Sequence, residues 1–146
     1  ICVKNGDSSR YIFNVYFPPS GGDEFVEVLD DLSLLLNEYG ETDEHEIIVI
    51  GDFNVRLGSE GGPRGTGPCS PQGKLVLQAL CKGQTCTPLV CVDMSTKGAG
   101  PMYTFNREGI GSSWIDHIFV SAKCIQYVKS CSVLEEHPLK IGRAHV

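Results

Sequence analysis

Short apolar runs that end in polar residues are the clearest pattern along the chain. The run Ile-Ile-Val-Ile at 47–50 is followed directly by Gly51, Asp52, Phe53 and Asn54. A continuous apolar run of this length, bounded by turn residues, predicts a buried β-strand. Asp52 and Asn54 are two residues apart, so we expect both side chains on the same side of the chain where it leaves the core.

Alternation and helical spacing predict the other elements. Aromatic-rich alternation over 11–17 predicts a strand that Pro18 and Pro19 end. Apolar residues at three- and four-residue spacing predict an amphipathic helix over 23–39, with Gly40 as its C-terminal stop. Weaker patterns predict a Gly- and Pro-rich loop over 58–73, a helix over 74–82, and strands over 89–92, 102–105, 115–120 and 125–133, the last two being antiparallel neighbours.

Two helices among about six short strands predict an α/β (α+β) fold in which helices cover one side of a mixed β-sheet. Such a sheet leaves its other apolar face uncovered, and large exposed apolar patches are usually interaction sites. We therefore expect a further part of the domain, or a partner, against that face. The chain begins with Ile1 rather than Met, so we expect translation to start upstream and the chain to be a fragment.

Net charge and hydropathy argue against two classes of protein, electrostatic nucleic-acid binders and membrane-spanning proteins. The formal net charge of −6 argues against a stand-alone electrostatic nucleic-acid binder, because Lys and Arg supply most non-specific affinity for phosphates. It is compatible with a metal-dependent nuclease, whose carboxylates surround a cation. No run approaches the roughly 20 apolar residues that a membrane helix needs, so we expect no membrane partner.

The seven cysteines form no Cys-x-x-Cys pair, and no His lies at zinc-finger spacing from them. Several of them lie in apolar segments, where free cysteine behaves as a small hydrophobic residue. We interpret them as reduced thiols of an intracellular protein.

Five motifs in order resemble a known family. Along the chain come YFPPS, GDFN, YTF, SSWIDHIFVS and a His-Pro pair. This order is similar to the second half of the endonuclease/exonuclease/phosphatase superfamily, and its spacing looks most like the APE-like endonuclease domain of non-LTR (LINE-type) retrotransposons. The resemblance covers nearly the whole chain. It implies that residues 1–146 form the C-terminal half of a four-layer α/β-sandwich whose N-terminal half is missing.

The resemblance assigns catalytic roles residue by residue. Asp52 and Asn54 of GDFN would orient the attacking water and hold the scissile phosphate. The residue types agree, because a carboxylate can take a proton from water and an amide can donate to a phosphoryl oxygen. Asp116 would accept a hydrogen bond from His137 and fix its tautomer, while His137 donates to the phosphate. The alternative interpretation of GDFN is an Asx turn at a strand end.

Two further residues match substrate contacts of the family. Tyr16 of YFPP matches a phosphate-contacting tyrosine in the catalytic site, and its alternative is a core aromatic of the strand. Thr104 of YTF matches a hydroxyl near the substrate backbone, and its alternative is an ordinary β-branched strand residue. His117 is expected on the opposite face of the strand from Asp116, outside this set.

The resemblance implies Mg²⁺ (or Mn²⁺) as cofactor, with Glu136 and Asp52 as its ligands in this chain. Most family members carry Asp in a Ser-Asp-His triplet where this chain has Glu136, preceded by Glu135. The additional methylene displaces the carboxylate by more than an ångström, a scale to which catalytic geometry is sensitive. The family's first half supplies an Asn and the principal metal-binding Glu, and neither has a counterpart here. The tail Gly142 to Val146 departs from the expected strand.

The resemblance thus predicts a Mg²⁺-dependent phosphodiesterase, the DNA endonuclease domain of a LINE-type retrotransposon polyprotein, incomplete as given. Its expected partners are DNA as substrate and the missing N-terminal half of the same domain. A reverse transcriptase domain would follow, and the expected location is intracellular, in the nucleus. Two alternatives stay open: an inactive truncated or domesticated copy that acts as a binding module, and a phosphatase of the same superfamily.

Overall fold

The computed structural model describes residues 1–40, 45–83 and 87–134. Within them the fold is mixed α+β, with one five-stranded mixed sheet and few helices. The elements in chain order are β1 (Cys2–Asn5), β2 (Ser8–Tyr16), α1 (Asp23–Gly40), β3 (His45–Asp52), the 3₁₀ helix η1 (Gly58–Glu60), α2 (Pro71–Cys81), β4 (Leu89–Cys91), β5 (Gly98–Ala99), β6 (Phe105–Arg107), β7 (Gly111–Ser113), β8 (Asp116–Ser121), the 3₁₀ helix η2 (Ala122–Tyr127) and β9 (Cys131–Ser132).

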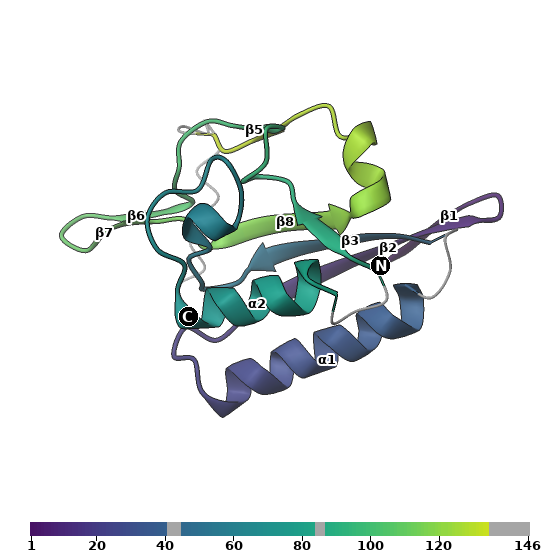
Figure 1. The fold of residues 1–146 in the computed structure, drawn as a ribbon, viewed down its shortest axis with the longest axis horizontal. Coiled ribbons are helices and arrows are strands. Elements are labelled where there is room, and N and C mark those ends of the chain that lie inside the picture. Colours follow the sequence, from purple (N-terminus) through teal and green to yellow (C-terminus); the bar gives the residue numbers. More distant parts are fainter. Residues whose placement is uncertain (41–44, 84–86, 135–146) are drawn as a thin grey trace, which may run out of the picture.

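The main sheet has the strand order β1-β2-β3-β8-β4 (Figure 1). The strands β2 and β3 are parallel and are connected by α1, whereas β8 is antiparallel to both of its neighbours, β3 and β4. The short strands form two further sheets, β5 with β9 and β6 with β7. The predicted mixed sheet is therefore present. The last residues of its central strands β2 and β3 lie beside the first residue of β8.

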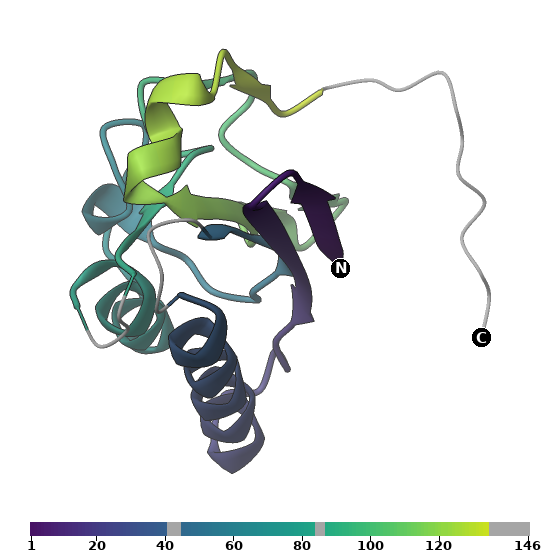
Figure 2. The same ribbon diagram turned by 90° about the vertical axis from the view of Figure 1, so that its right-hand side faces the viewer.

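Both α-helices cover the same face of the sheet, as the edge-on view shows (Figure 2). The helical spacing of apolar residues explains this packing, because Leu32 and Leu36 of α1 lie on one side of the helix and are buried. They share a core with Ile47 and Val49 of β3 and with Phe119 of β8. Each of these five side chains is at most 3% exposed. No described helix is both long and apolar enough to cross a membrane.

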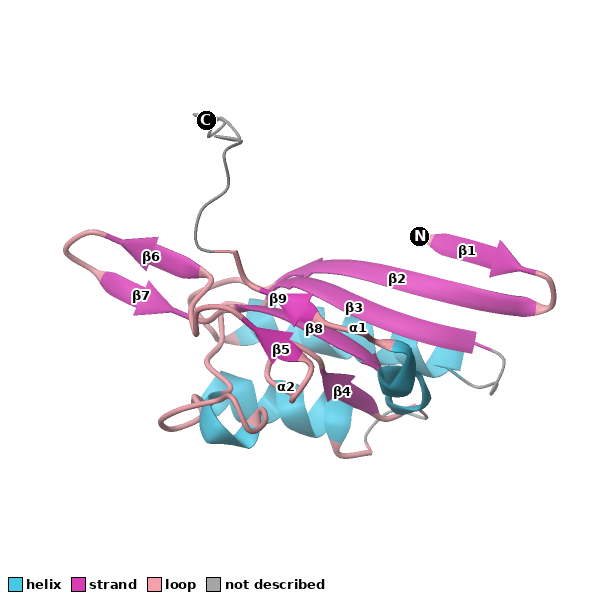
Figure 3. Cartoon of the chain, turned by 90° about the horizontal axis from the view of Figure 1, so that it is seen from above, coloured by secondary structure: helices cyan, strands magenta, loops and turns pink. Residues whose placement is uncertain are grey.

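The other face of the main sheet is only partly covered. The 3₁₀ helix η2 and the β5–β9 ribbon lie on this side, away from the helices (Figures 2 and 3). Ile50 of β3 is 38% exposed and Tyr16 of β2 is 64% exposed. A cleft of about 400 Å³ runs along this face beside Ile48 and Val120. The predicted apolar face opposite the helices is thus present in the described residues, but η2 and the β5–β9 ribbon cover part of it.

Gly51 permits the close approach of β2 and β3 where both strands end. Its φ of +153° is one that L side chains rarely adopt, and a Cβ there would lie 1.9 Å from the backbone oxygen of Val15. The absence of a side chain therefore keeps β3 hydrogen-bonded to β2 as far as Asp52, whose register partner is Tyr16.

One predicted strand is wrong. The segment 125–133 was expected to pair with β8, but η2 occupies Ala122–Tyr127 and only Cys131–Ser132 is a strand. The physical reason is that both edges of β8 are already paired, one with β3 and the other with β4. The segment therefore turns away after Ser121 and pairs with β5 instead.

Other segments also differ from the prediction. The second helix begins at Pro71 rather than 74, because the Ser70 side chain accepts a hydrogen bond from the Gly73 N–H and caps it. The strand expected over 102–105 is displaced to Phe105–Arg107, within a hairpin. The expected loop over 58–73 contains η1 and is fixed by Arg64, whose guanidinium donates to the Asp93, Ala99 and Gly100 carbonyl oxygens.

Candidate functional site

Three side chains meet where the central strands end. Tyr16 is the last residue of β2, Asp52 the last of β3 and Asp116 the first of β8. Their Cα atoms are register partners, Tyr16 with Asp52 and Asp52 with Asp116. Directly paired residues of neighbouring strands project from the same face of a sheet. We call these three residues the strand-end cluster; they lie on the partly covered face, where Tyr16 and Asp116 are exposed.

The two carboxylates of the strand-end cluster influence each other. Burial raises the pKa of Asp52 above its ordinary value, the Asn54 N–H acts in the opposite direction, and the nearby Asp116 carboxylate adds to the rise. Two like charges at one level of adjacent strands repel each other. The arrangement therefore favours a proton or a cation between or beside the two aspartates.

Asn54 is held in an unusual conformation beside this cluster. Its φ is +49°, in the left-handed region, and its N–H donates to Asp52 Oδ1 at 2.9 Å. This is the Asx turn that the sequence offered as an alternative. Its side-chain amide also donates to the Phe17 carbonyl oxygen at 2.7 Å, which uses one of the two amide hydrogens. The second amide hydrogen can serve a substrate oxygen.

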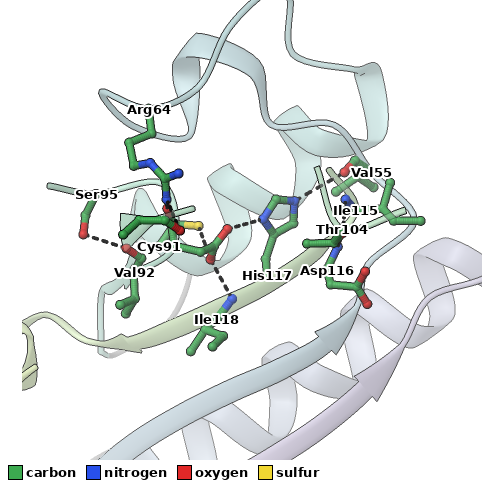
Figure 4. A network of polar contacts seen from close by, with 12 residues as sticks. Val55, Arg64, Cys91, Val92, Ser95, Thr104, Ile115, Asp116, His117 and Ile118 are labelled. Atoms are coloured by element: carbon green, nitrogen blue, oxygen red, sulfur yellow. Dashed lines mark hydrogen bonds and ion pairs between the residues drawn. The ribbon is translucent and has the colours of Figure 1, made fainter. Parts of the chain in front are cut away.

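Thr104 fixes the start of β8 from outside the sheet. Its Oγ1 accepts the backbone N–H groups of Ile115 at 3.1 Å and Asp116 at 3.0 Å (Figure 4). Thr104 lies in the loop before β6 rather than within a strand. Its hydroxyl oxygen therefore positions Asp116, and its hydroxyl hydrogen remains as a donor.

Two predicted site residues, Glu136 and His137, lie outside the described residues. The expected hydrogen bond between Asp116 and His137 therefore stays a prediction, as does the metal ligation by Glu136. Of the predicted site, the structure brings together Tyr16, Asp52 and Asp116, with Asn54 and Thr104 contacting the backbone or side chains of that cluster.

A second set of polar residues lies next to the cluster but is buried. His117 is 1% exposed and its Nδ1 lies 2.9 Å from Asp93 Oδ2. Asp93 Oδ1 accepts the Ile118 N–H at 2.8 Å and the Cys91 thiol at 3.3 Å. We call Cys91, Asp93 and His117 the buried group. His117 faces away from the exposed Asp116, as the alternation along the strand predicts.

Electrostatics in the buried group differ from those of the strand-end cluster. Burial acts to raise the pKa of Asp93, but the hydrogen bond and positive charge of His117 and the Ile118 N–H bring it below its ordinary value. Burial and the Asp93 carboxylate raise the pKa of Cys91 well above its ordinary value. The three ligand atoms lie within 4.8 Å of one another, so the group could hold a metal ion.

Sequence reasoning did not single out Asp93, although a signal was present. Asp93 follows the apolar run Leu89 to Val92 in the way that Asp52 follows the run at 47–50. A carboxylate directly after a buried strand is thus a recurring pattern in this chain.

Comparison with protein-family models gives no match for this chain, and comparison with curated proteins gives none either.

Proposed function

We propose that the chain is part of a Mg²⁺-dependent phosphodiesterase of the endonuclease/exonuclease/phosphatase superfamily, the DNA endonuclease domain of a LINE-type retrotransposon polyprotein. The observation that carries the proposal is the register that sets Tyr16, Asp52 and Asp116 side by side at the ends of three neighbouring strands. Strand ends that deliver carboxylates and hydroxyl donors to one spot suit hydrolysis of a charged phosphodiester.

The donor set at the strand ends fits a hard divalent cation. Mg²⁺ prefers carboxylate oxygens and keeps several waters, so one or two protein carboxylates suffice. Asp52 and Glu136 would hold it, and the repulsion between Asp52 and Asp116 would decrease in its presence. When bound, the ion would stabilise the negative charge that develops on the phosphoryl oxygens.

The protein side chains would supply proton transfer and orientation. Asp52 would take a proton from the attacking water as its oxygen bonds to phosphorus and the bond to the leaving oxygen breaks. The free amide hydrogen of Asn54 and the hydroxyl of Tyr16 would donate to non-bridging oxygens. Asp116 would orient His137, which donates to the phosphate.

The partly covered face of the sheet supports the proposal that the chain is one half of a larger domain. In a four-layer α/β-sandwich a second sheet would pack against the side that carries Ile48, Ile50 and Ile118, opposite α1 and α2. That second sheet would belong to the N-terminal half of the same domain, which would supply the remaining Asn and Glu of the site. The strand-end cluster would then lie at the junction of the two halves.

The test is nicking of a supercoiled plasmid by the full-length protein that contains this chain, with Mg²⁺ and with a chelator. Asp116→Asn should reduce the Mg²⁺-dependent rate by about 100-fold or more, because it removes the carboxylate that orients the catalytic imidazole. The matched control is Asp30→Asn, which neutralises an exposed carboxylate on α1 and should leave the rate unchanged.

Other outcomes separate the alternatives. DNA binding without nicking would favour an inactive binding module. Release of phosphate from lipid or nucleotide phosphates, without nicking, would favour a phosphatase of the same superfamily. Nicking that is equal in Asp116→Asn and the wild type would contradict the assignment of the strand-end cluster.

A further inference from the structure

The buried group is unusually polar for its position. Cys91, Asp93 and His117 are 4%, 3% and 1% exposed, and they lie where β4 ends beside β8. Their thiol, carboxylate and imidazole converge on one point from two segments more than 20 residues apart in sequence. Figure 4 shows the Cys91 and His117 side chains of this group. The proposed phosphodiesterase chemistry uses none of these three side chains.

The ligand types select one class of cation. Thiolate and imidazole are soft or borderline ligands that favour Zn²⁺ and similar transition metals, whereas Mg²⁺ prefers oxygen ligands alone. The site therefore differs in chemistry from the oxygen-rich strand-end cluster. A spacing search for zinc motifs cannot find it, because His117 lies on a different strand from Cys91.

The distances are close to those that a tetrahedral ion requires. With metal–ligand distances of 2.0–2.3 Å, neighbouring ligand atoms lie roughly 3.4–3.6 Å apart. His117 Nδ1 lies 2.9 Å from Asp93 Oδ2, and the three ligand atoms, one from each residue, lie within 4.8 Å of one another. Cys91 Sγ contacts the other carboxylate oxygen, Asp93 Oδ1, at 3.3 Å, so small side-chain rotations would bring Sγ, Oδ2 and Nδ1 to the required separations. Asp93 Oδ2 could then bind the ion while Oδ1 keeps the Ile118 N–H.

His117 already has an acceptor for its second ring nitrogen. Its Nε2 lies 3.4 Å from the Val55 carbonyl oxygen (Figure 4). A metal-binding histidine usually donates its other N–H to a carbonyl or carboxylate, which fixes the tautomer and orients the ring. With the proton on Nε2, the lone pair of Nδ1 points toward the other two ligand atoms.

A path to the site and a source for a fourth ligand are also present. A cleft of about 320 Å³ on the partly covered face is lined by Asp93, His117 and Cys131, among others. Water in this cleft, or the half-buried Cys131 thiol, could complete four-coordination.

We propose that Cys91, Asp93 and His117 bind one divalent transition-metal ion of the Zn²⁺ class, which ties β4 to β8. Metal–sulfur, metal–oxygen and metal–nitrogen bonds form as the Cys91 thiol loses its proton to solvent. The Nδ1 proton of His117 is also released to solvent, so that Nδ1 can bind the ion, and the ring keeps its proton on Nε2 beside the Val55 carbonyl oxygen. The proposal does not depend on the phosphodiesterase activity, because it involves neither the strand-end cluster nor its cation.

Co²⁺ binding to the metal-free, reduced full-length protein tests the proposal, because Co²⁺ replaces Zn²⁺ and shows a thiolate charge-transfer band. We expect about one thiolate-bound Co²⁺ per chain, displaced by Zn²⁺. Loss of an outer partner of a metal ligand typically costs 10–100-fold in affinity, so Cys91→Ser should weaken binding by more than about 100-fold. The control Cys69→Ser changes a buried thiol outside the group and should keep the band.

A measurement on the wild-type protein tests the proposal without requiring the Cys91→Ser variant to fold. Nitrogen NMR of the imidazole rings should show Zn²⁺ at Nδ1 of His117 and the proton on Nε2. A His117 spectrum unchanged by Zn²⁺ would overturn the proposal. So would a Co²⁺ complex without a thiolate band, or a band that Cys91→Ser leaves intact.

Discussion

The strand-end cluster and the buried group share strand β8 but occupy opposite environments. Asp116 and His117 are consecutive residues, yet the first is exposed on the partly covered face and the second is 1% exposed in the core. The alternation of side chains along a strand produces this division. One strand can therefore contribute to a hydrated site and to a closed polar group at the same time.

The two aspartates that follow apolar strands illustrate what environment does to one residue type. Asp52 has few donors and a neighbouring carboxylate, and its pKa is raised with burial as the main cause. Asp93 is more deeply buried, but His117, Ile118 and Cys91 all donate to it, and its pKa is lowered. At Asp93 the hydrogen-bond donors outweigh burial and determine the direction of the pKa shift. We infer that Asp93 is essential for stability, whereas Asp52 is available for chemistry.

The largest expected effect on stability is at Asp93, and it tests the contrast between the two aspartates directly. Asp93→Ala should lower the free energy of unfolding by about 3–5 kcal/mol, because it leaves buried donors without an acceptor. Asp52→Ala should lower it by less than about 1 kcal/mol, as is usual for a partly exposed side chain. Urea denaturation of both variants measures the difference. Equal losses of stability would contradict the division between the two sites.

A smaller effect is expected at Gly51, which lets β2 and β3 approach at the strand-end cluster. Gly51→Ala should cost about 1–3 kcal/mol, because its Cβ would overlap the Val15 carbonyl oxygen. The matched control is Gly109→Ala, whose φ is also positive but whose Cβ would meet nothing within 4 Å. Both variants introduce backbone strain, but only Gly51→Ala also introduces a steric clash, so we expect a lower denaturation midpoint for Gly51→Ala than for Gly109→Ala. Equal midpoints for the two variants would argue against a close approach at Gly51.

The smallest expected effect concerns Thr104, the link from the loop to the first residue of β8. Thr104→Val keeps the shape but removes the acceptor of the Ile115 and Asp116 N–H groups, which should cost about 1–2 kcal/mol. Amide hydrogen exchange should accelerate at these two residues. The exposed Thr96→Val provides the control. Unchanged exchange at Asp116 would show that Thr104 does not position it.

Strong local patterns predicted the central elements. The apolar run at 47–50 and the helical spacing over 23–39 correspond to β3 and α1, and alternation placed His117 away from Asp116. These features depend on periodicity within one segment, which a sequence displays directly.

Features that depend on other segments were missed. The strand expected over 125–133 failed because β4 occupies the free edge of β8, which only the assembled sheet reveals. The β1–β2 hairpin had a readable local signal in Gly6-Asp7, the two loop residues between the paired Asn5 and Ser8, because Gly followed by Asp favours two-residue turns. Cys91 and His117 form one group only through the pairing of β4 with β8, so sequence spacing could not identify it.

We propose above that Asp52 at the strand ends takes part in phosphodiester hydrolysis. The most direct test measures Mg²⁺-dependent plasmid nicking and the unfolding midpoint of the full-length protein and of Asp52→Asn. We expect a loss of about 100-fold or more in nicking with an unchanged midpoint, because the substitution removes a proton acceptor and leaves the fold intact. Nicking at the wild-type rate by a folded Asp52→Asn protein would contradict it.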